Sequence, residues 1–155
     1  QVKYQNLKNF ELPLGLKGFF DYEEALMLAK NSKKPLFLDF TGFACENCRQ
    51  MEHNVWSKPH IEKLLKEEFI VVSLFVDSRY KLPESEWSYN EDSKPIKHLG
   101  LKNLDIEIKK YGNPAQPLYV VIDSEENILS GPIGYCSKEE FYAFLKFGIE
   151  SHKNK

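Results

Sequence analysis

Apolar and polar positions change their spacing along the chain, and these changes predict its secondary structure. The segment "DYEEALMLAK" has helical spacing, with Asp21 as a suitable N-cap and Glu24 three residues later to complete a capping-box pattern. Residues 36–40 are almost wholly apolar and follow a proline, which can open a strand. They predict a strand covered on both faces, and "FIVVSLFVD" (residues 69–77) predicts the next strand.

Helical spacing returns between and after these strands. Apolar positions from Cys48 onward predict a helix that Pro59 interrupts, and Ser57 is placed to cap a second helix. A later helix is expected from an apolar stripe made of Leu101, Leu104, Ile108 and Tyr111.

The end of the chain predicts a hairpin followed by a helix. The runs "LYVVID" and "ILSGPIG" flank the polar turn "SEEN" and indicate two antiparallel strands. Ser137 and Glu140 form a second capping-box pattern at the start of the last helix. The apolar face of that helix comprises Phe141, Phe144, Leu145 and Ile149.

The order of elements is helix, strand, helix, strand, helix, strand, strand, helix, which is typical of an α/β protein. We expect a small mixed central sheet with helices on both faces, because the first strand–helix–strand unit should be parallel and the hairpin antiparallel. Breakers in residues 1–20 indicate an irregular N-terminal segment, and residues 21–155 form the predicted domain. Within it, the polar residues 79–97 are interpreted as a surface insertion.

Composition excludes several classes of function. The chain has 155 residues, the size of one domain, and 42% are hydrophobic, so disorder is not expected. A net charge of -2 lacks the basic footprint of a nucleic-acid binder. The longest apolar run is too short to span a bilayer. The first ten residues have no apolar core of a signal peptide, so no leader is expected.

The main candidate for chemistry is the pair Cys45 and Cys48, which follows a buried strand and opens a helix. A thiolate is the attacking species in disulfide exchange, and a helix N-terminus stabilises that anion. Cys45 is expected to be the exposed nucleophile, and Cys48, one turn later, the shielded resolving thiol. In an α/β pattern this placement favours a redox pair.

Two alternatives stand beside the redox interpretation. His53 lies five residues after Cys48 and begins a zinc-knuckle spacing, but the fourth position is Lys58, which is no ligand. The other alternative is two reduced core cysteines without chemistry. The third cysteine, Cys136, is interpreted as a packed small residue, and no metal site is expected.

Two further residues suggest chemistry near the pair. Asp39 lies in an apolar strand, so it is either a strand-end acid facing solvent or a buried acid that exchanges a proton with Cys48. Pro117 precedes an apolar strand, either as an ordinary trans residue or as a cis proline. In the second case the main chain of Gln116 is free to pair with an extended substrate segment.

Together, "KPLFLDFTGFACENCRQME", "VWSKP" and "AQPLYVVID" carry a resemblance to thioredoxin-fold proteins over about residues 19–150. The chain resembles most the C-terminal thioredoxin-like domain of membrane thiol:disulfide interchange proteins of the DsbD type, as found in Bacteroides-like bacteria. The resemblance implies a thioredoxin fold in which Cys45 attacks, Cys48 resolves, Asp39 is the buried acid and Pro117 is the cis proline.

The resemblance also implies a surface for the substrate protein around the cysteine pair. By position it comprises Phe43, Ala44, Glu46, Asn47, Gln116 and Pro117. Three of these positions depart from the family pattern, since Ala44 replaces a common tryptophan and Glu46-Asn47 replaces the thioredoxin Gly-Pro. These departures bear on the redox potential and the partner surface.

The predicted function is that of a protein-disulfide reductant that needs no metal or organic cofactor. By resemblance it is a periplasmic domain tethered to the inner membrane. There it takes electrons from a membrane-embedded domain and passes them to periplasmic disulfide proteins, including those of cytochrome c biogenesis. The alternatives are a free-standing periplasmic thioredoxin-like enzyme and a docking module whose cysteines do not turn over.

Overall fold

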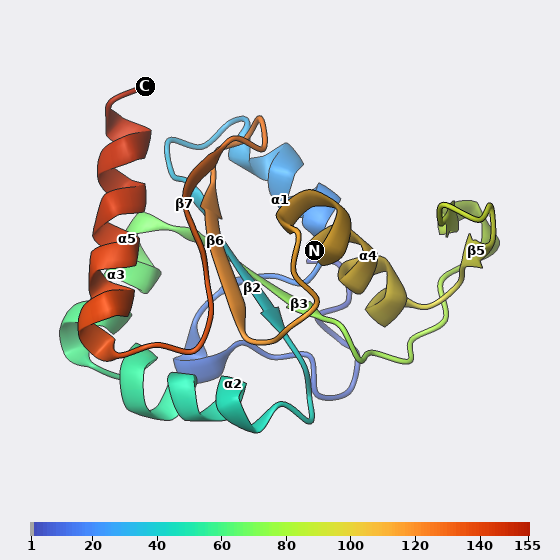
Figure 1. Cartoon of the computed structure of the whole chain (residues 1–155), viewed down its shortest axis with the longest axis horizontal. Helices are drawn as coiled ribbons and strands as arrows, with labels where there is room; N and C mark the ends of the chain where they lie inside the picture. Colours follow the sequence, from blue (N-terminus) through green and yellow to red (C-terminus); the bar gives the residue numbers. More distant parts are fainter. Residues whose placement is uncertain (1) are drawn as a thin grey trace.

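The computed structural model describes residues 2–155 and contains a five-stranded sheet between two layers of helices (Figure 1). Its strand order is β1-β3-β2-β6-β7. The strands are β1 (Gly18–Phe19), β2 (Leu36–Thr41), β3 (Ile70–Phe75), β6 (Leu118–Ile122) and β7 (Ile128–Ile133). The central strand β2 pairs in parallel with β3 and antiparallel with β6, so the expected mixed sheet is confirmed.

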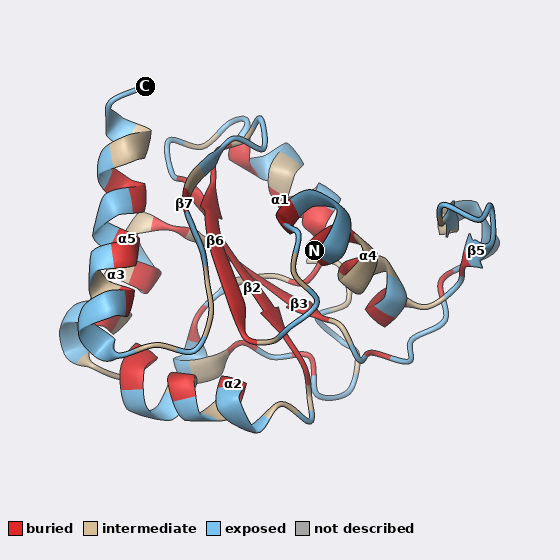
Figure 2. Cartoon of the chain, in the orientation of Figure 1, coloured by how far each residue is buried: buried red, intermediate tan, exposed pale blue. Residues whose placement is uncertain are grey.

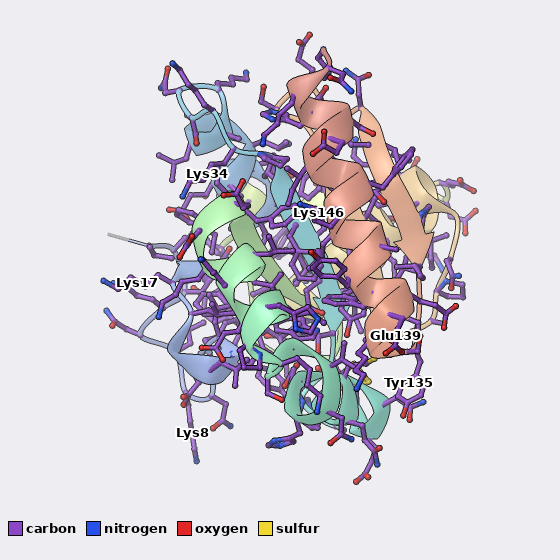
Figure 3. The ribbon with its side chains drawn as sticks, turned by 90° about the vertical axis from the view of Figure 1, so that its left-hand side faces the viewer. Lys8, Lys17, Lys34, Tyr135, Glu139 and Lys146 are labelled. Carbon is purple, nitrogen blue, oxygen red and sulfur yellow. A yellow bond between two sulfur atoms is a disulfide. The ribbon has the colours of Figure 1, made fainter. Side chains whose placement is uncertain are left out.

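Helices cover both faces of the sheet, as expected. They are α1 (Tyr22–Ala29), α2 (Glu46–Met51), α3 (Pro59–Glu68), α4 (Leu99–Tyr111) and α5 (Lys138–Lys153). In Figure 1, α1 and α4 lie on one side of the sheet and α3 and α5 on the other. Figure 3 shows α3 and α5 side by side on their face.

The central strand divides the core in two. All residues of β2 are buried (Figure 2). Successive side chains of a strand point to opposite faces of the sheet. Leu36, Leu38 and Phe40 pack with the residues of α1 and α4, while Phe37 packs with Trp56 and α5 on the other face. Asp39 therefore points to the face that α3 and α5 cover.

The N-terminal segment is more ordered than its sequence suggests. Residues 1–20 are expected to be irregular, but Gly18–Phe19 form β1, which pairs in parallel with β3. A 3-10 turn, η1 (Pro13–Gly15), precedes it, and Phe10, Leu12 and Leu16 are buried in the core. A strand of two residues is too short to show a period, which explains the error. The domain boundary at residue 20 stays a prediction.

The apolar stripe predicted for α4 is correct at Tyr111, which is buried, but wrong at two other positions. Leu101 and Ile108 are 52% and 46% exposed, whereas the polar residues Asn103 and Glu107 are buried. Asn103 donates a hydrogen bond of 3.0 Å to the last carbonyl of β3, which offsets part of the cost of its burial. The helix thus turns a partly polar face to the sheet, and hydrophobic spacing cannot show such a face.

The helix starts follow the sequence in part. Asp21 caps α1 by accepting a hydrogen bond from the Glu24 N–H, but the Glu24 carboxylate binds the main chain of Lys3 instead of closing a capping box. At α5, Ser137 and Glu140 form the complete box.

The connection from α2 to α3 differs from the expectation. A π-helical segment, η2 (Glu52–Trp56), continues α2, and α3 begins at Pro59. Ser57 does not cap α3, because its hydroxyl donates to the carbonyl of His53 one turn back.

The predicted insertion at residues 79–97 extends from the end of β3 toward α4. It contains a 3-10 turn, η3 (Glu84–Glu86), and the two-stranded ribbon β4 (Ser88–Tyr89) and β5 (Pro95–Ile96). This ribbon protrudes at the right of Figure 1 and is mostly exposed in Figure 2.

Candidate active site

Cys45 and Cys48 are joined by a disulfide, with their Cα atoms 5.3 Å apart. Cys45 is the N-cap of α2, and its Sγ accepts a hydrogen bond of 3.2 Å from the N–H of Cys48. Cys48 is fully buried, while Cys45 is partly exposed. Only one of the two sulfurs is thus open to an attacking thiol, and a thiolate at Cys45 would lie against unpaired N–H groups of the first helical turn.

The loop before Cys45 is held by a residue that sequence reasoning missed. The N–H groups of Phe43 and Ala44 donate to the two oxygens of Asp77, at 2.9 and 3.2 Å. The ring of Phe43 stacks on Phe75, with centroids 4.1 Å apart. A signal for Asp77 exists, because the carboxyl ends of the parallel strands β2 and β3 meet at one edge of the sheet.

Three residues expected to contact the substrate are exposed next to Cys45 and Cys48. Ala44, Glu46 and Asn47 are exposed, and the last two belong to the first turn of α2. Contact with a substrate protein requires this exposure, but exposure does not test the contact, so their role stays a prediction.

Asp39 is buried, with 1% of its surface exposed, so the solvent-facing alternative is excluded. Its Oδ2 accepts a hydrogen bond of 2.9 Å from the hydroxyl of Ser73, and its Oδ1 has no hydrogen-bond partner within residues 2–155. Burial raises the pKa of Asp39 to about 8, and the nearby Glu52 carboxylate adds to this effect. Asp39 therefore holds a proton at neutral pH.

A polar cluster connects Asp39 to the cysteine helix. Arg49 donates to the hydroxyl of Thr41 at 2.8 Å and forms an ion pair of 3.0 Å with Glu52. Burial raises the pKa of Glu52, and Arg49 acts against that shift. These residues and Asp39 line a cavity of about 310 Å³ between the sheet, α2 and residues 9–15. Sequence reasoning missed Glu52, although it lies two helical turns after Cys45.

The segment before β6 lies at the same edge of the sheet as the cysteine loop, because Leu118 pairs with Phe40. The peptide bond between Gln116 and Pro117 is cis, Pro117 is buried and Gln116 is half-buried. Within the part of the chain that the structure describes, no hydrogen bond involves the main-chain N–H or C=O of Gln116.

The loop before α5 lies next to this segment. A side chain at Gly134 would come within 3.5 Å of the carbonyl oxygen of Pro117. The neighbouring Tyr135 is 56% exposed and lies at the α2 end of the molecule in Figure 3.

Cys136 is a free, half-buried thiol packed against the core. Burial raises its pKa to about 11, with a smaller contribution from Glu140, so it is not ionised at neutral pH. Among residues 2–155, no three histidine, cysteine or acidic side chains come together as a metal site.

Comparison with known proteins identifies the family to which the fold belongs. The model of a thioredoxin-like family matches residues 17–99, which is more than half of the chain. The chain belongs to the thioredoxin-like family. It is a thioredoxin-like oxidoreductase whose C-x-x-C pair, Cys45 and Cys48, forms a disulfide. A search of curated proteins found no match.

Several solved structures share the fold. The chain is similar to DsbH oxidoreductase, with 21% identity, coverage of 94% and 93% of the two chains, and a TM-score of 0.62. A thioredoxin from Thermus thermophilus gives 24% identity, 83% and 84% coverage and a TM-score of 0.57. The oxidised C-terminal domain of DsbD from Neisseria meningitidis gives 18%, 89% and 98%, and 0.52. These likenesses confirm the expected thioredoxin-like fold.

None of the helices within residues 2–155 has the length and hydropathy that crossing a membrane requires.

Proposed function

We propose that this protein is a protein-disulfide reductant that gives two electrons to disulfides of partner proteins. The observation that carries the proposal is a disulfide with one open sulfur, Cys45, and one buried sulfur, Cys48, at the head of a helix. This asymmetry suits thiol–disulfide exchange, because the exposed thiol attacks the partner disulfide and the buried thiol then resolves the mixed disulfide.

The reaction balances as two successive exchanges. The Cys45 thiolate attacks one sulfur of the partner disulfide, forms a mixed disulfide and releases the other partner sulfur as a thiolate. Cys48 then loses its proton and attacks the Cys45 sulfur, which frees the second partner thiolate and leaves the Cys45–Cys48 disulfide. The partner has gained two electrons, and an external dithiol donor reverses the change on Cys45 and Cys48.

Asp39 is the group proposed to handle the proton of Cys48. It points from the central strand to the face where α3 and α5 lie, and it shares a cavity with Arg49 of α2. In the oxidised protein its raised pKa keeps it protonated near neutral pH, so it can supply a proton when reduction releases the Cys48 thiolate. In the reverse step it takes the proton back.

The partners and the compartment belong to the same proposal. Its support is the likeness to the C-terminal domain of DsbD and to DsbH, both of which share the fold at low identity. We propose periplasmic disulfide proteins as acceptors and a membrane-embedded domain as the electron donor. No bound metal or organic group takes part in the proposed exchange.

Insulin reduction with dithiothreitol as the electron source tests the proposal. The protein should accelerate the precipitation of insulin, Cys45→Ser should abolish the effect, and Cys136→Ser should leave it unchanged. A wild-type protein without activity would favour a docking module whose cysteines do not turn over.

A further inference from the structure

Glu107 stands out because it is a carboxyl group with 0% exposure in the middle of α4. Its Oε1 accepts a hydrogen bond of 2.8 Å from the side chain of Gln116, and its Oε2 has no hydrogen-bond partner within residues 2–155. Burial raises the pKa of Glu107 to about 7, against the effect of Gln116. A buried acid with one neutral partner costs stability, so stability alone does not account for it.

The partner of Glu107 is a residue at the edge of the active site. The side-chain nitrogen of Gln116 donates to Glu107 and, at 2.9 Å, to the carbonyl of Pro114. An amide nitrogen has two hydrogens, so both are in use. The side chain is thus held on the protein, while its main-chain N–H and C=O make no hydrogen bond within the described residues.

These groups are placed to meet a polypeptide. Leu118, two residues after Gln116, pairs with Phe40 at the end of the central strand, and Cys45 follows five residues after Phe40. An extended segment bound through free main-chain groups gains affinity from hydrogen bonds that are independent of its side chains. Holding the receiving residue in one conformation before binding lowers the entropy lost on association.

We propose that Glu107 is a positioning residue for polypeptide disulfides. It holds Gln116 so that the main chain of this residue pairs with the extended segment that flanks the partner's cysteine. The proposal rests on the disulfide reductase function above and assigns part of the affinity for polypeptide partners to a buried acid on α4. Small disulfides without a peptide backbone do not use this contact.

The test compares two disulfides that differ in having a backbone. Pre-reduced protein is mixed with either a cystine-bridged peptide or hydroxyethyl disulfide over a range of concentrations, and thiols are trapped after a single turnover. For the peptide, Glu107→Met should raise the half-saturation concentration about three- to tenfold, the range that corresponds to one hydrogen bond. The maximal rate and the reaction with hydroxyethyl disulfide should not change. Glu107→Gln, which still offers an acceptor, should behave like the wild type.

Gln116→Leu and the double variant provide the second measurement. If Glu107 acts through Gln116, Gln116→Leu should weaken peptide binding to a similar extent, and adding Glu107→Met should have no further effect. Glu107→Met should not lower the melting temperature, as it would if the acid were a structural support. If Glu107→Met slows the reduction of both disulfides equally, or if the losses in peptide affinity add up in the double variant, the role of Glu107 is wrong. The proposed reductase function would then still stand. A wild type that reduces neither disulfide would overturn the proposed function and this inference with it.

Discussion

Ser73 donates a hydrogen bond of 2.9 Å to Asp39, and the two residues stand opposite each other on the parallel strands β3 and β2. This neutral donor is the only hydrogen-bond partner that the side-chain carboxyl group of Asp39 has within residues 2–155. One such bond does not replace the water that an ionised carboxylate loses on burial. Asp39 therefore keeps its proton to about pH 8, and this has consequences for stability and for turnover.

Asp39→Asn should stabilise the oxidised protein more at pH 8 than at pH 4. The folded protein holds the proton of Asp39 up to about pH 8, while the unfolded chain releases it near its ordinary value of 3.8. Between these values the folded state binds more protons than the unfolded state, so wild-type stability falls as the pH rises. Urea denaturation across this range measures the difference. Parallel stability curves for the two proteins would show that Asp39 does not titrate as the structure indicates.

The same variant should fold but turn over more slowly. If Asp39 exchanges a proton with Cys48, its loss should reduce the rate by about 100-fold, at the low end of general acid–base effects. The wild-type rate should change with pH around 8, and the variant should lose that change. Insulin reduction between pH 6 and 9 provides the profile, and identical profiles would make Asp39 a bystander.

Cys45 should react with alkylating agents before the other two cysteines of the reduced protein. Cys48 is fully buried, and burial raises the pKa of Cys136 to about 11, so neither offers an accessible thiolate. Cys45 combines partial exposure with a helix N-terminus. Mass mapping after a limiting dose of iodoacetamide measures the order. First labelling at Cys48 or Cys136 would mean that the roles are assigned wrongly.

Asp77→Ala should loosen the loop that carries Cys45. The Asp77 carboxylate accepts the N–H groups of Phe43 and Ala44, and its removal leaves both without this acceptor. Since the loop is exposed to water, the loss in free energy of unfolding should be modest, about 1 kcal/mol. Hydrogen exchange at these two amides should accelerate, and less so in Asp77→Asn, which keeps one acceptor. Unchanged exchange in Asp77→Ala would contradict this account of the loop.

Local patterns in the sequence predict secondary structure, but they do not reveal contacts between residues that are far apart in the chain. The continuous apolar run at residues 36–40, the hairpin and the apolar face of α5 are clear local patterns, so these elements were predictable. So was the cysteine pair at the head of a helix, because strand, turn and helix are contiguous there. Local patterns and the three-dimensional structure agree at these positions.

The residues around the pair were harder to predict because their partners are remote in sequence. Asp77 binds the loop before Cys45 across the ends of two strands, and Glu107 meets Gln116 between a helix and a loop. In α4 the hydrophobic stripe predicted only part of the buried face, since two polar residues are also buried and find hydrogen-bond donors or acceptors there. A spacing rule scores such residues as exposed, whereas the fold satisfies part of their hydrogen bonding.

The last prediction concerns the redox potential and the charge of Glu46. This exposed residue adjoins Cys45 in the first turn of α2, and its negative charge disfavours the Cys45 thiolate. The helix N-terminus favours the thiolate by about 0.3–1 kcal/mol at exposed positions, so the two effects are similar in size. A thiolate with little net stabilisation gives a less stable reduced form and a disulfide that is harder to reduce.

We therefore expect a potential nearer to the roughly -270 mV of thioredoxin than to the roughly -120 mV of DsbA. Glu46→Gln removes the charge without changing the shape of the side chain, so it should lower the pKa of Cys45 and make the potential less negative. Equilibration with glutathione or dithiothreitol, followed by thiol trapping, measures both proteins under the same conditions. A wild-type potential above about -180 mV, in the range of the disulfide isomerases, would contradict the role of electron donor. A more negative potential in Glu46→Gln would show that the charge does not act on the Cys45 thiolate.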